Sequence, residues 1–265
     1  LQKELPGEVF TTRTLATYSY ELNNKKAPFD NVNVRKALNL SLDRNVITDK
    51  VLGQGQTPTY VFTPTYIEEG QLIQQPAYSK EPMAQRNEEA IKLLEEAGYS
   101  KANPLKFSIL YNTNENHKKV AIAAASMWKA NTKGLIDVKL ENQEWKTYID
   151  SRRAGRYDAA RAGWNADYNQ ATTFGNYFLS NSSNNTAKYA NPEYDKAIAE
   201  SYVATDAEGR AKAYAKAEEI LAKDFGIVPI FNYVNPRLVK PYVKGYSGKD
   251  PQDHIYLRNL YIIKH

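Results

Sequence analysis

Hydrophobic residues recur along this chain with two spacings, one typical of helices and one typical of strands. In the first helical stretch they lie four residues apart from Val34 to Val46, on one face of a helix predicted over residues 32–52. The polar residues 30–31 can cap the start of this helix, and Gly53 follows its end. The same spacing predicts further helices over residues 83–97, 114–129, 144–155, 192–203 and 207–223.

Alternation of hydrophobic and polar residues predicts strands between several of these helices. The segments with this pattern are "PLKFSILYN" (104–112), "IDVKLEN" (136–142), "YDAARAGW" (157–164) and "GIVPIFNYVN" (226–235). Pro229 in the last segment predicts an edge strand or a bulge. Residues 54–82 show no period and are expected to form a long irregular connection. Residues 236–265 are expected to be extended chain that ends in a short strand, "LYIIKH".

The order of these elements indicates the fold class. Strand, helix, strand, helix and strand follow one another over residues 104–164, which is a βαβαβ unit and implies an α/β fold with a parallel sheet. Ligands of open α/β sheets bind outside the carboxyl ends of the strands. Two polar loops, residues 111–117 and 164–169, follow such ends, and they lie side by side if their strands are neighbours. The sequence therefore predicts the candidate site at this edge of the sheet.

Composition and charge argue against several classes of function. The chain has 265 residues, 42% hydrophobic and 25% charged, which is typical of a folded globular protein. Its net charge of +5 arises from interleaved acidic and basic residues, so no nucleic-acid partner is expected. There is no cysteine, and the three histidines, His117, His254 and His265, are scattered. No metal site and no cofactor are therefore expected.

Sequence motifs of common enzymes are missing as well. The chain contains no G-x-S-x-G nucleophile turn, no H-E-x-x-H zinc motif, no P-loop and no G-x-G-x-x-G. Glu144, Asp150 and Asp167 could supply the acid pair of a glycoside hydrolase, but any chain of this length offers such a trio. We therefore expect a binding protein and no enzyme. A peptide or glycan hydrolase is the alternative from another class.

The segment "RAGWNADYNQ" (161–170) favours a binding site. Asp167 follows Trp164 and precedes a tyrosine, so a carboxylate is available for a ligand cation and aromatic rings can exclude water. Arg161 and Arg152 are available for a ligand carboxylate, which guanidinium groups bind in bidentate fashion. A ligand with a cation at one end and a carboxylate at the other, such as a peptide, matches this set.

Each of these residues also has a purely structural alternative. Arg161 could pair only with Asp158, and Trp164 could be a core residue at the end of a strand. His117, in the first turn of a predicted helix, could be a solvated or capping residue. Their clustering at the ends of strands is the reason to favour a ligand site.

Longer segments of the chain resemble the peptide receptors of bacterial ABC importers, in the family-5 extracellular solute-binding proteins. The resemblance is to the C-terminal half of these receptors, so we expect a cut product that lacks the N-terminal half of the same protein. It implies a periplasmic-binding-protein type II lobe, with a central mixed sheet flanked by helices, over residues 16–234. Residues 1–15 and 235–265 would be crossing segments that belong with the absent first lobe. The segments that carry the resemblance are "NNKKAPFDNVNVRKALNLSLDR", "LLEEAGY", "LYNTNENHKK", "NQEWKTYIDSR", "ARAGWNADYN", "LSNSSNNTAKY" and "YVNPRLVKPYVKGYSGKDP".

The resemblance also implies a role for each candidate residue. Asp167 would pair with the α-ammonium of a bound oligopeptide. The carboxylates of peptides of different lengths would be bound by Arg161, Arg152 and His117. The residues implied to line the side-chain pockets or to bond the peptide backbone are Trp164, Tyr233, Ala162 and Gly163.

By the same resemblance, the protein binds oligopeptides with little side-chain selectivity and delivers them to the membrane subunits of an ABC permease. Its location would be the periplasm, or the outer side of the cytoplasmic membrane on a lipid anchor. A receptor for murein tripeptide or for haem in the same family is the alternative.

Overall fold

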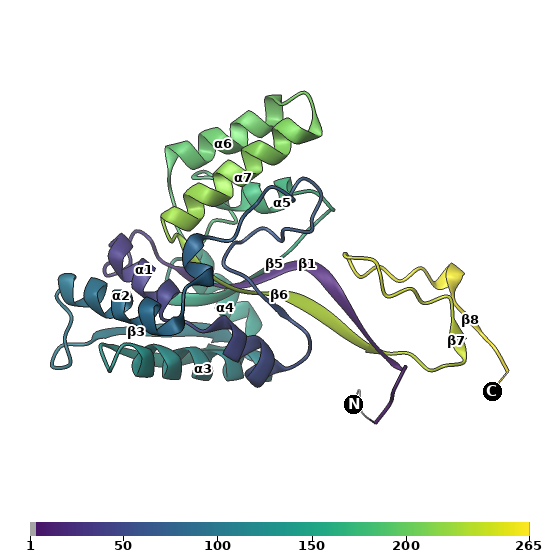
Figure 1. Ribbon diagram of the computed structural model, residues 1–265, viewed down its shortest axis with the longest axis horizontal. Coiled ribbons are helices and arrows are strands. Elements are labelled where there is room, and N and C mark those ends of the chain that lie inside the picture. Colours follow the sequence, from purple (N-terminus) through teal and green to yellow (C-terminus); the bar gives the residue numbers. More distant parts are fainter. Residues whose placement is uncertain (1–3, 265) are drawn as a thin grey trace.

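A six-stranded mixed sheet forms the centre of the computed structural model, which describes residues 4–264 (Figure 1). The strands lie in the order β2-β6-β1-β5-β3-β4. Their bounds are β1 Val9–Leu22, β2 Thr57–Pro58, β3 Leu105–Asn112, β4 Ile136–Gln143, β5 Ala159–Asn165 and β6 Ile227–Leu238. Helices flank this sheet, so the predicted fold class is confirmed.

The middle of the chain forms the predicted βαβαβ unit. Strand β3 pairs in parallel with β4 and with β5, and the connecting helices are α3 (Glu115–Asn131) and α4 (Trp145–Arg153). Strand β1 pairs in antiparallel orientation with β5 and with β6. Because β3 and β5 are neighbours, residues 111–117 and 164–169 follow adjacent strand ends at one edge of the sheet, as predicted.

Most of the other helices match their predicted ranges. Residues 54–82 contain only β2 and one short 3-10 turn, so the predicted irregular connection is confirmed. The remaining helices are α1 Val32–Leu40, α2 Met83–Glu96, α5 Thr172–Gly175, α6 Pro192–Val203 and α7 Ala207–Lys223. The shorter helical turns are η1 Val46–Leu52, η2 Ala77–Lys80, η3 Asn176–Phe178 and η4 Leu257–Asn259.

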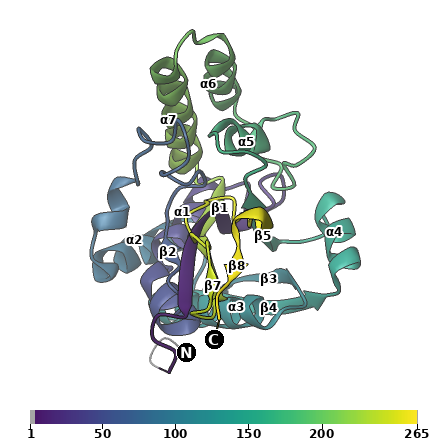
Figure 2. The same cartoon turned by 90° about the vertical axis from the view of Figure 1, so that its right-hand side faces the viewer.

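Buried side chains join the sheet to three sets of helices. Tyr18 and Tyr20 of β1 belong to the largest core, together with residues of α1, α2 and α3. On the opposite face of the sheet, Ala160 packs against Tyr148 of α4. Leu15 packs in the core of the α5, α6 and α7 region, and Figures 1 and 2 show α6 and α7 as a layer above the sheet.

The structure corrects the first predicted helix. Residues 32–52 do not form one helix, because α1 ends at Leu40 and the π-helical turn η1 begins at Val46. Arg86 of α2 donates a hydrogen bond to Leu40 O at 3.0 Å, which satisfies a carbonyl group at the end of α1. The Asp43 carboxylate accepts from Val46 N at 3.3 Å and so caps the new turn. The spacing of hydrophobic residues cannot show such a contact from 46 positions away.

Strand β1 was not predicted from the sequence. The alternation of polar with aromatic residues from Thr17 onwards is a strand signal that was available. Alternation ordinarily places the polar residues in solvent. Here the polar positions Ser19 and Glu21 are fully buried, so β1 is a central strand that is covered on both faces.

The pairing of β1 with β6 is irregular at two places. Between Tyr18 and Ser19 the register shifts by one residue of β6, next to Pro229, which confirms the predicted bulge. A second shift lies between Arg13 and Thr17, close to the segment boundary expected at residue 15. Both strands run through the expected boundaries without interruption.

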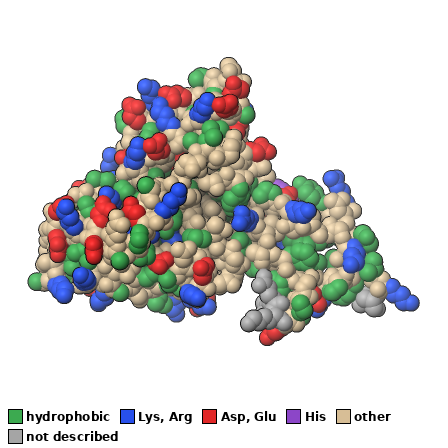
Figure 3. Space-filling view, in the orientation of Figure 1, with side chains coloured by type: hydrophobic (Ala, Val, Ile, Leu, Met, Phe, Trp, Pro, Cys, Tyr) green, Lys and Arg blue, Asp and Glu red, His purple; other side chains and the backbone are tan. Residues whose placement is uncertain are grey.

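The start of β1 and the end of β6 extend away from the helices and form an arm together with the return segment, residues 239–264 (Figure 1). This segment contains β7 (Val243–Lys244) and β8 (Tyr261–Ile262), which pair in antiparallel orientation and confirm the short final strand. His265 lies outside the described residues. Hydrophobic side chains gather on the arm in Figure 3. The exposed ones are Leu238, Ile255, Tyr256, Leu257, Tyr261, Ile262 and Ile263.

Candidate functional site

A cavity of about 530 Å³ lies at the carboxyl end of β5, between the sheet and the return segment. Its walls come from the neighbouring parts of β1, β5 and β6, from Trp145 at the start of α4, and from residues 251–253. The return segment is fixed there because Leu15 N donates to Pro251 O at 2.8 Å. Ligand pockets commonly measure about 300–1,000 Å³. The cavity is therefore large enough for part of a ligand such as a peptide.

Arg161 contributes an unpaired positive charge to this cavity. Its guanidinium donates to the hydroxyl of Tyr233, another lining residue, and lies 5.2 Å from the centre of the Tyr18 ring. The Nε atom is buried without a hydrogen-bond partner. Within residues 4–264 the side chains that interact most strongly with this charge are tyrosines, and no carboxylate forms an ion pair with it. Asp158, the partner considered from the sequence, forms an ion pair with Lys26. A ligand carboxylate would compensate the charge of Arg161.

His117 lies beside Arg161. The centre of its ring is 5.6 Å from that of Tyr18, which also contacts the guanidinium. Burial and the nearby charge of Arg161 lower the pKa of His117 to about 3, so the imidazole is neutral near pH 7. A neutral imidazole can still donate one hydrogen bond to a carboxylate. The cap of α3 is Asn114, whose side chain accepts from His117 N at 3.2 Å.

Arg152 has a carboxylate and two hydroxyl groups as partners inside the protein, although its buried Nε has no hydrogen-bond partner. Its guanidinium forms a buried ion pair with Glu21 at 2.8 Å and donates to the hydroxyl groups of Tyr177 (3.2 Å) and Thr186 (3.0 Å). Tyr177 also donates to Glu21, at 2.6 Å. Glu21 is a site residue that the sequence analysis missed, and its only signal was a carboxylate among hydroxyl and aromatic residues in β1.

The structure separates Arg152 from the two other residues with which the sequence grouped it. Tyr20 is the cross-strand partner of Arg161, so their side chains share one face of the sheet. Glu21 follows Tyr20 and points to the other face, where it binds Arg152. Arg161 and His117 are therefore together, and Arg152 lies across the sheet from them.

Trp164 and Gly163 border a second cavity, of about 200 Å³, which Arg152 also lines. The indole of Trp164 packs edge to face with Tyr177, with 4.9 Å between ring centres. Ala162 is buried and does not line either cavity. Trp164 is only half-buried, so it lies at the border of the core and remains available to a ligand.

Asp167 lies at the rim of the larger of these two cavities, just beyond the end of β5. Its neighbour Ala166 lines that cavity, and the carbonyl oxygen of Asp167 accepts from Gln252 Nε2 at 3.3 Å. Its side chain is exposed, and its carboxylate accepts one hydrogen bond, from Thr173 Oγ1 at 3.3 Å. Within residues 4–264 no cation pairs with this carboxylate, which leaves it available to a ligand.

Strand β5 presents backbone groups without a strand partner. Its pairing with β3 ends at Ala160, whereas its pairing with β1 continues to Asn165. Ala166 N donates to Leu15 O of β1 at 2.8 Å, so the alternate residues Gly163 and Asn165 direct their N–H and C=O groups to the open side. An extended ligand can pair with such an edge as an added strand.

The absence of a side chain at Gly163 lets Arg161 and Tyr233 meet above the strand. A Cβ atom there would lie 2.9 Å from Arg161 Nη2 and 3.1 Å from the hydroxyl oxygen of Tyr233. Gly163 therefore leaves the space in which the guanidinium of Arg161 reaches Tyr233.

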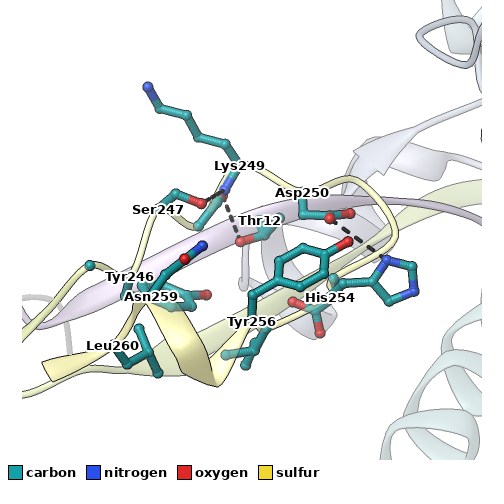
Figure 4. A pocket seen from close by; sticks show the side chains of 13 residues that line it. Thr12, Tyr246, Ser247, Lys249, Asp250, His254, Tyr256, Asn259 and Leu260 are labelled. Atoms are coloured by element: carbon teal, nitrogen blue, oxygen red, sulfur yellow. Dashed lines mark hydrogen bonds and ion pairs between the residues drawn. The ribbon is translucent and has the colours of Figure 1, made fainter.

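A smaller hollow of about 40 Å³ lies in the return segment (Figure 4). Its polar groups bind one another: Thr12 Oγ1 donates to Gly248 O at 2.9 Å, and His254 lies 3.7 Å from Asp250. It is too small for a peptide. Residues 4–264 contain no cluster of three or more side chains suited to a metal ion, and none of the described helices is long and apolar enough to cross a membrane.

Comparison with known proteins places this site in a family. The family described as bacterial extracellular solute-binding proteins, family 5 Middle, matches residues 1–186. The chain belongs to this family. It is 96% identical over its full 265 residues to the periplasmic oligopeptide-binding protein OppA of Haemophilus influenzae, of which it covers 49%. It is 44% identical to the periplasmic murein peptide-binding protein MppA of Escherichia coli, of which it also covers 49%.

A solved structure supports the fold of this family member. The crystal structure of Haemophilus influenzae OppA in complex with RPPGFSPFR matches with a TM-score of 0.94 and 95% identity, over 100% of this chain and 52% of that chain. The chain thus spans about half the length of the curated relatives it matches.

Proposed function

We propose that this chain is part of a non-catalytic receptor that binds oligopeptides in the periplasm and delivers them to the membrane subunits of an ABC permease. The names of its relatives support the ligand class and the location. The observation that carries the proposal is the larger cavity, where the unpaired charge of Arg161 and the open edge of β5 meet.

In this proposal the backbone of the peptide pairs with β5. Gly163 and Asn165 supply the free N–H and C=O groups, and the bound segment lies as an added strand beside them. Backbone pairing does not depend on the side chains of the ligand. Side-chain selectivity is then weak, provided that the cavities beside Trp164 and Tyr233 accept side chains together with water.

The two ends of the peptide meet opposite charges. Arg161 receives the carboxylate of a short peptide, with His117 as a neutral hydrogen-bond donor beside it. Asp167 pairs with the α-ammonium at the rim of the cavity. Arg152 lines the smaller cavity and can contact the carboxylate of a peptide of another length. We expect a weaker contribution from it, because Glu21 already neutralises its charge.

The arm provides the connection to the rest of the receptor. We propose that residues 16–234 form one lobe and that residues 1–15 and 235–265 belong with a second lobe, supplied by the N-terminal half of the same protein. A two-stranded sheet is at best marginally stable alone, yet β7 and β8 lie on an arm with many exposed hydrophobic side chains. Contact with a second lobe would bury this surface.

The ligand class can be tested on the full-length natural protein that contains these 265 residues. Mass spectrometry of the molecules that co-purify with it should find peptides of mixed sequence. A single murein tripeptide, or haem, would instead indicate one of the narrower receptors of the family. A peptide library incubated with the same protein should remain intact. Cleavage of its peptides would indicate a hydrolase and refute the proposal.

The role of Asp167 can be tested by calorimetry with trialanine. If a second lobe encloses the ion pair, Asp167→Ala should weaken binding by about 3–5 kcal/mol, as for a broken buried pair. An exposed pair would lose less than about 1 kcal/mol. Acetylation of the peptide amine should cause a similar loss in the wild-type protein. Unchanged affinity in the variant would exclude the proposed role of Asp167.

A further inference from the structure

Thr173 connects two residues of the proposed site through a single hydroxyl group. Its Oγ1 atom donates to Asp167 Oδ2 at 3.3 Å and accepts from Asp167 N at 3.3 Å and from Trp164 Nε1 at 3.2 Å. A threonine hydroxyl has one hydrogen to donate and two lone pairs to accept with. All three are used here, so no hydrogen-bonding capacity remains for water or for the ligand.

The helical turn that carries Thr173 is itself held in place from several sides. Thr173 is 5% exposed, and the adjacent Phe174 is fully buried in the core below α5. Before the turn, Ala171 N donates to Glu68 O at 3.0 Å. At the end of the turn, the hydroxyl of Tyr194 in α6 donates to Gly175 O at 2.7 Å. The hydroxyl of Thr173 is therefore a fixed point relative to the more exposed loop that contains Asp167.

We propose that Thr173 is a positioning residue for recognition of the peptide α-ammonium. This positioning role rests on the proposed function, because it requires that Asp167 binds the ammonium group of the peptide. The hydroxyl holds Oδ2 of Asp167 and leaves Oδ1 free for the ligand. It also fixes the indole of Trp164 beside the same strand end. The carboxylate is thereby oriented before the ligand arrives, which reduces the conformational entropy lost on binding.

The test uses three variants of the full-length protein and calorimetric titration with trialanine and with N-acetyl-trialanine. Thr173→Val keeps the shape of the side chain and removes the hydroxyl. Thr173→Ser keeps the hydroxyl. Thr172→Val is the matched control, because it removes a neighbouring hydroxyl whose bonds go to Gln170 and Tyr214 and do not involve Asp167.

We expect Thr173→Val to weaken binding of trialanine about tenfold, the loss for one hydrogen bond to a charged group. Binding of the acetylated peptide should change less than about twofold, since it has no ammonium to recognise. Thr173→Ser and Thr172→Val should bind trialanine as the wild-type protein does. A purely structural role would weaken both peptides equally.

A second measurement separates failure of this inference from failure of the proposed function. On the Asp167→Ala background, Thr173→Val should cause little further loss of trialanine affinity, because the carboxylate that it orients is absent. If Thr173→Val lowers the affinity for trialanine equally in the wild-type and Asp167→Ala backgrounds, or in neither, the positioning role of Thr173 is refuted. The role of Asp167 in binding the ammonium is not affected by that result. Unchanged affinity of Asp167→Ala alone would refute the role of Asp167 and the inference together.

Discussion

Arg161 and Arg152 are two arginines on opposite faces of the same sheet, and their surroundings differ in one respect. Arg152 is bound to the carboxylate of Glu21 within a network of hydroxyl groups. Arg161 is surrounded by the rings of Tyr18 and Tyr233, and no carboxylate of the described residues pairs with it. The buried Nε of each arginine has no hydrogen-bond partner, so the carboxylate is what distinguishes the two. From the sequence alone, the two arginines were equally good candidates to bind the carboxylate of a ligand.

The difference indicates which of the two charges is available. The charge of Arg152 is compensated within the chain, so its main effect is expected on stability. Arg161 borders the larger cavity without a compensating charge, so its main effect is expected on binding. Leaving a buried charge without a partner is costly, which suggests that such an arrangement is kept for a ligand.

The largest expected effect is on stability and concerns Arg152. Replacing it by Met leaves the carboxylate of Glu21 buried without its cation, which should lower the free energy of unfolding by about 3–5 kcal/mol. Arg161→Met is the matched variant. It leaves no buried carboxylate behind and loses one hydrogen bond to Tyr233, so it should cost only about 1 kcal/mol.

Urea unfolding of both variants in the full-length protein measures this contrast. Equal losses would mean that the two arginines are not distinguished by their partners, and the comparison would fail. Glu21→Gln together with Arg152→Met should recover part of the stability, because the unpaired charge is then removed.

A smaller effect is expected from His117. Its pKa of about 3 in the folded protein lies below the value of about 6.5 for an unperturbed histidine. Between these two pH values the histidine binds more protons in the unfolded state than in the folded state. Its contribution to the stability of the fold is therefore complete above about pH 6.5 and is lost as the pH falls. His117→Gln should therefore lose less stability than the wild-type protein between pH 7 and pH 4.5.

His254→Gln is the matched control for this measurement, since the His254 side chain is 56% exposed in the return segment. Urea unfolding at the two pH values should show the change for His117→Gln alone. A pH dependence of stability that is unaffected by His117→Gln would show that neither burial nor the charge of Arg161 lowers the pKa of this ring.

Much of the fold was predictable where one face of an element is buried and the other is in solvent. Helices α6 and α7 match their predicted ranges for this reason. The early end of α1 was not predictable, because it depends on Arg86 from another helix. Strand β1 carried an alternating pattern, but its polar side chains are buried as well. Its central place in the sheet therefore could not be read from hydropathy.

The site was predictable to the extent that strand order determines it. The ends of β3 and β5 are neighbours, and this alone brings His117 towards Arg161. The ion pair of Arg152 with Glu21 spans 131 positions and follows from the antiparallel addition of β1, which the sequence analysis did not predict. Thr173 also escaped notice, because a threonine six positions after Asp167 carries no signal until the chain turns back through α5.

The most direct test of the account is the dependence of Arg161 on the peptide carboxylate. Calorimetry would compare trialanine with its C-terminal amide in the wild-type full-length protein and in Arg161→Met. The account predicts that amidation weakens wild-type binding by about 1.5–3 kcal/mol, the range for a hydrogen bond to a charged group, and has little effect in the variant. An equal loss on amidation in both proteins would contradict it, and the carboxylate would then have to bind elsewhere.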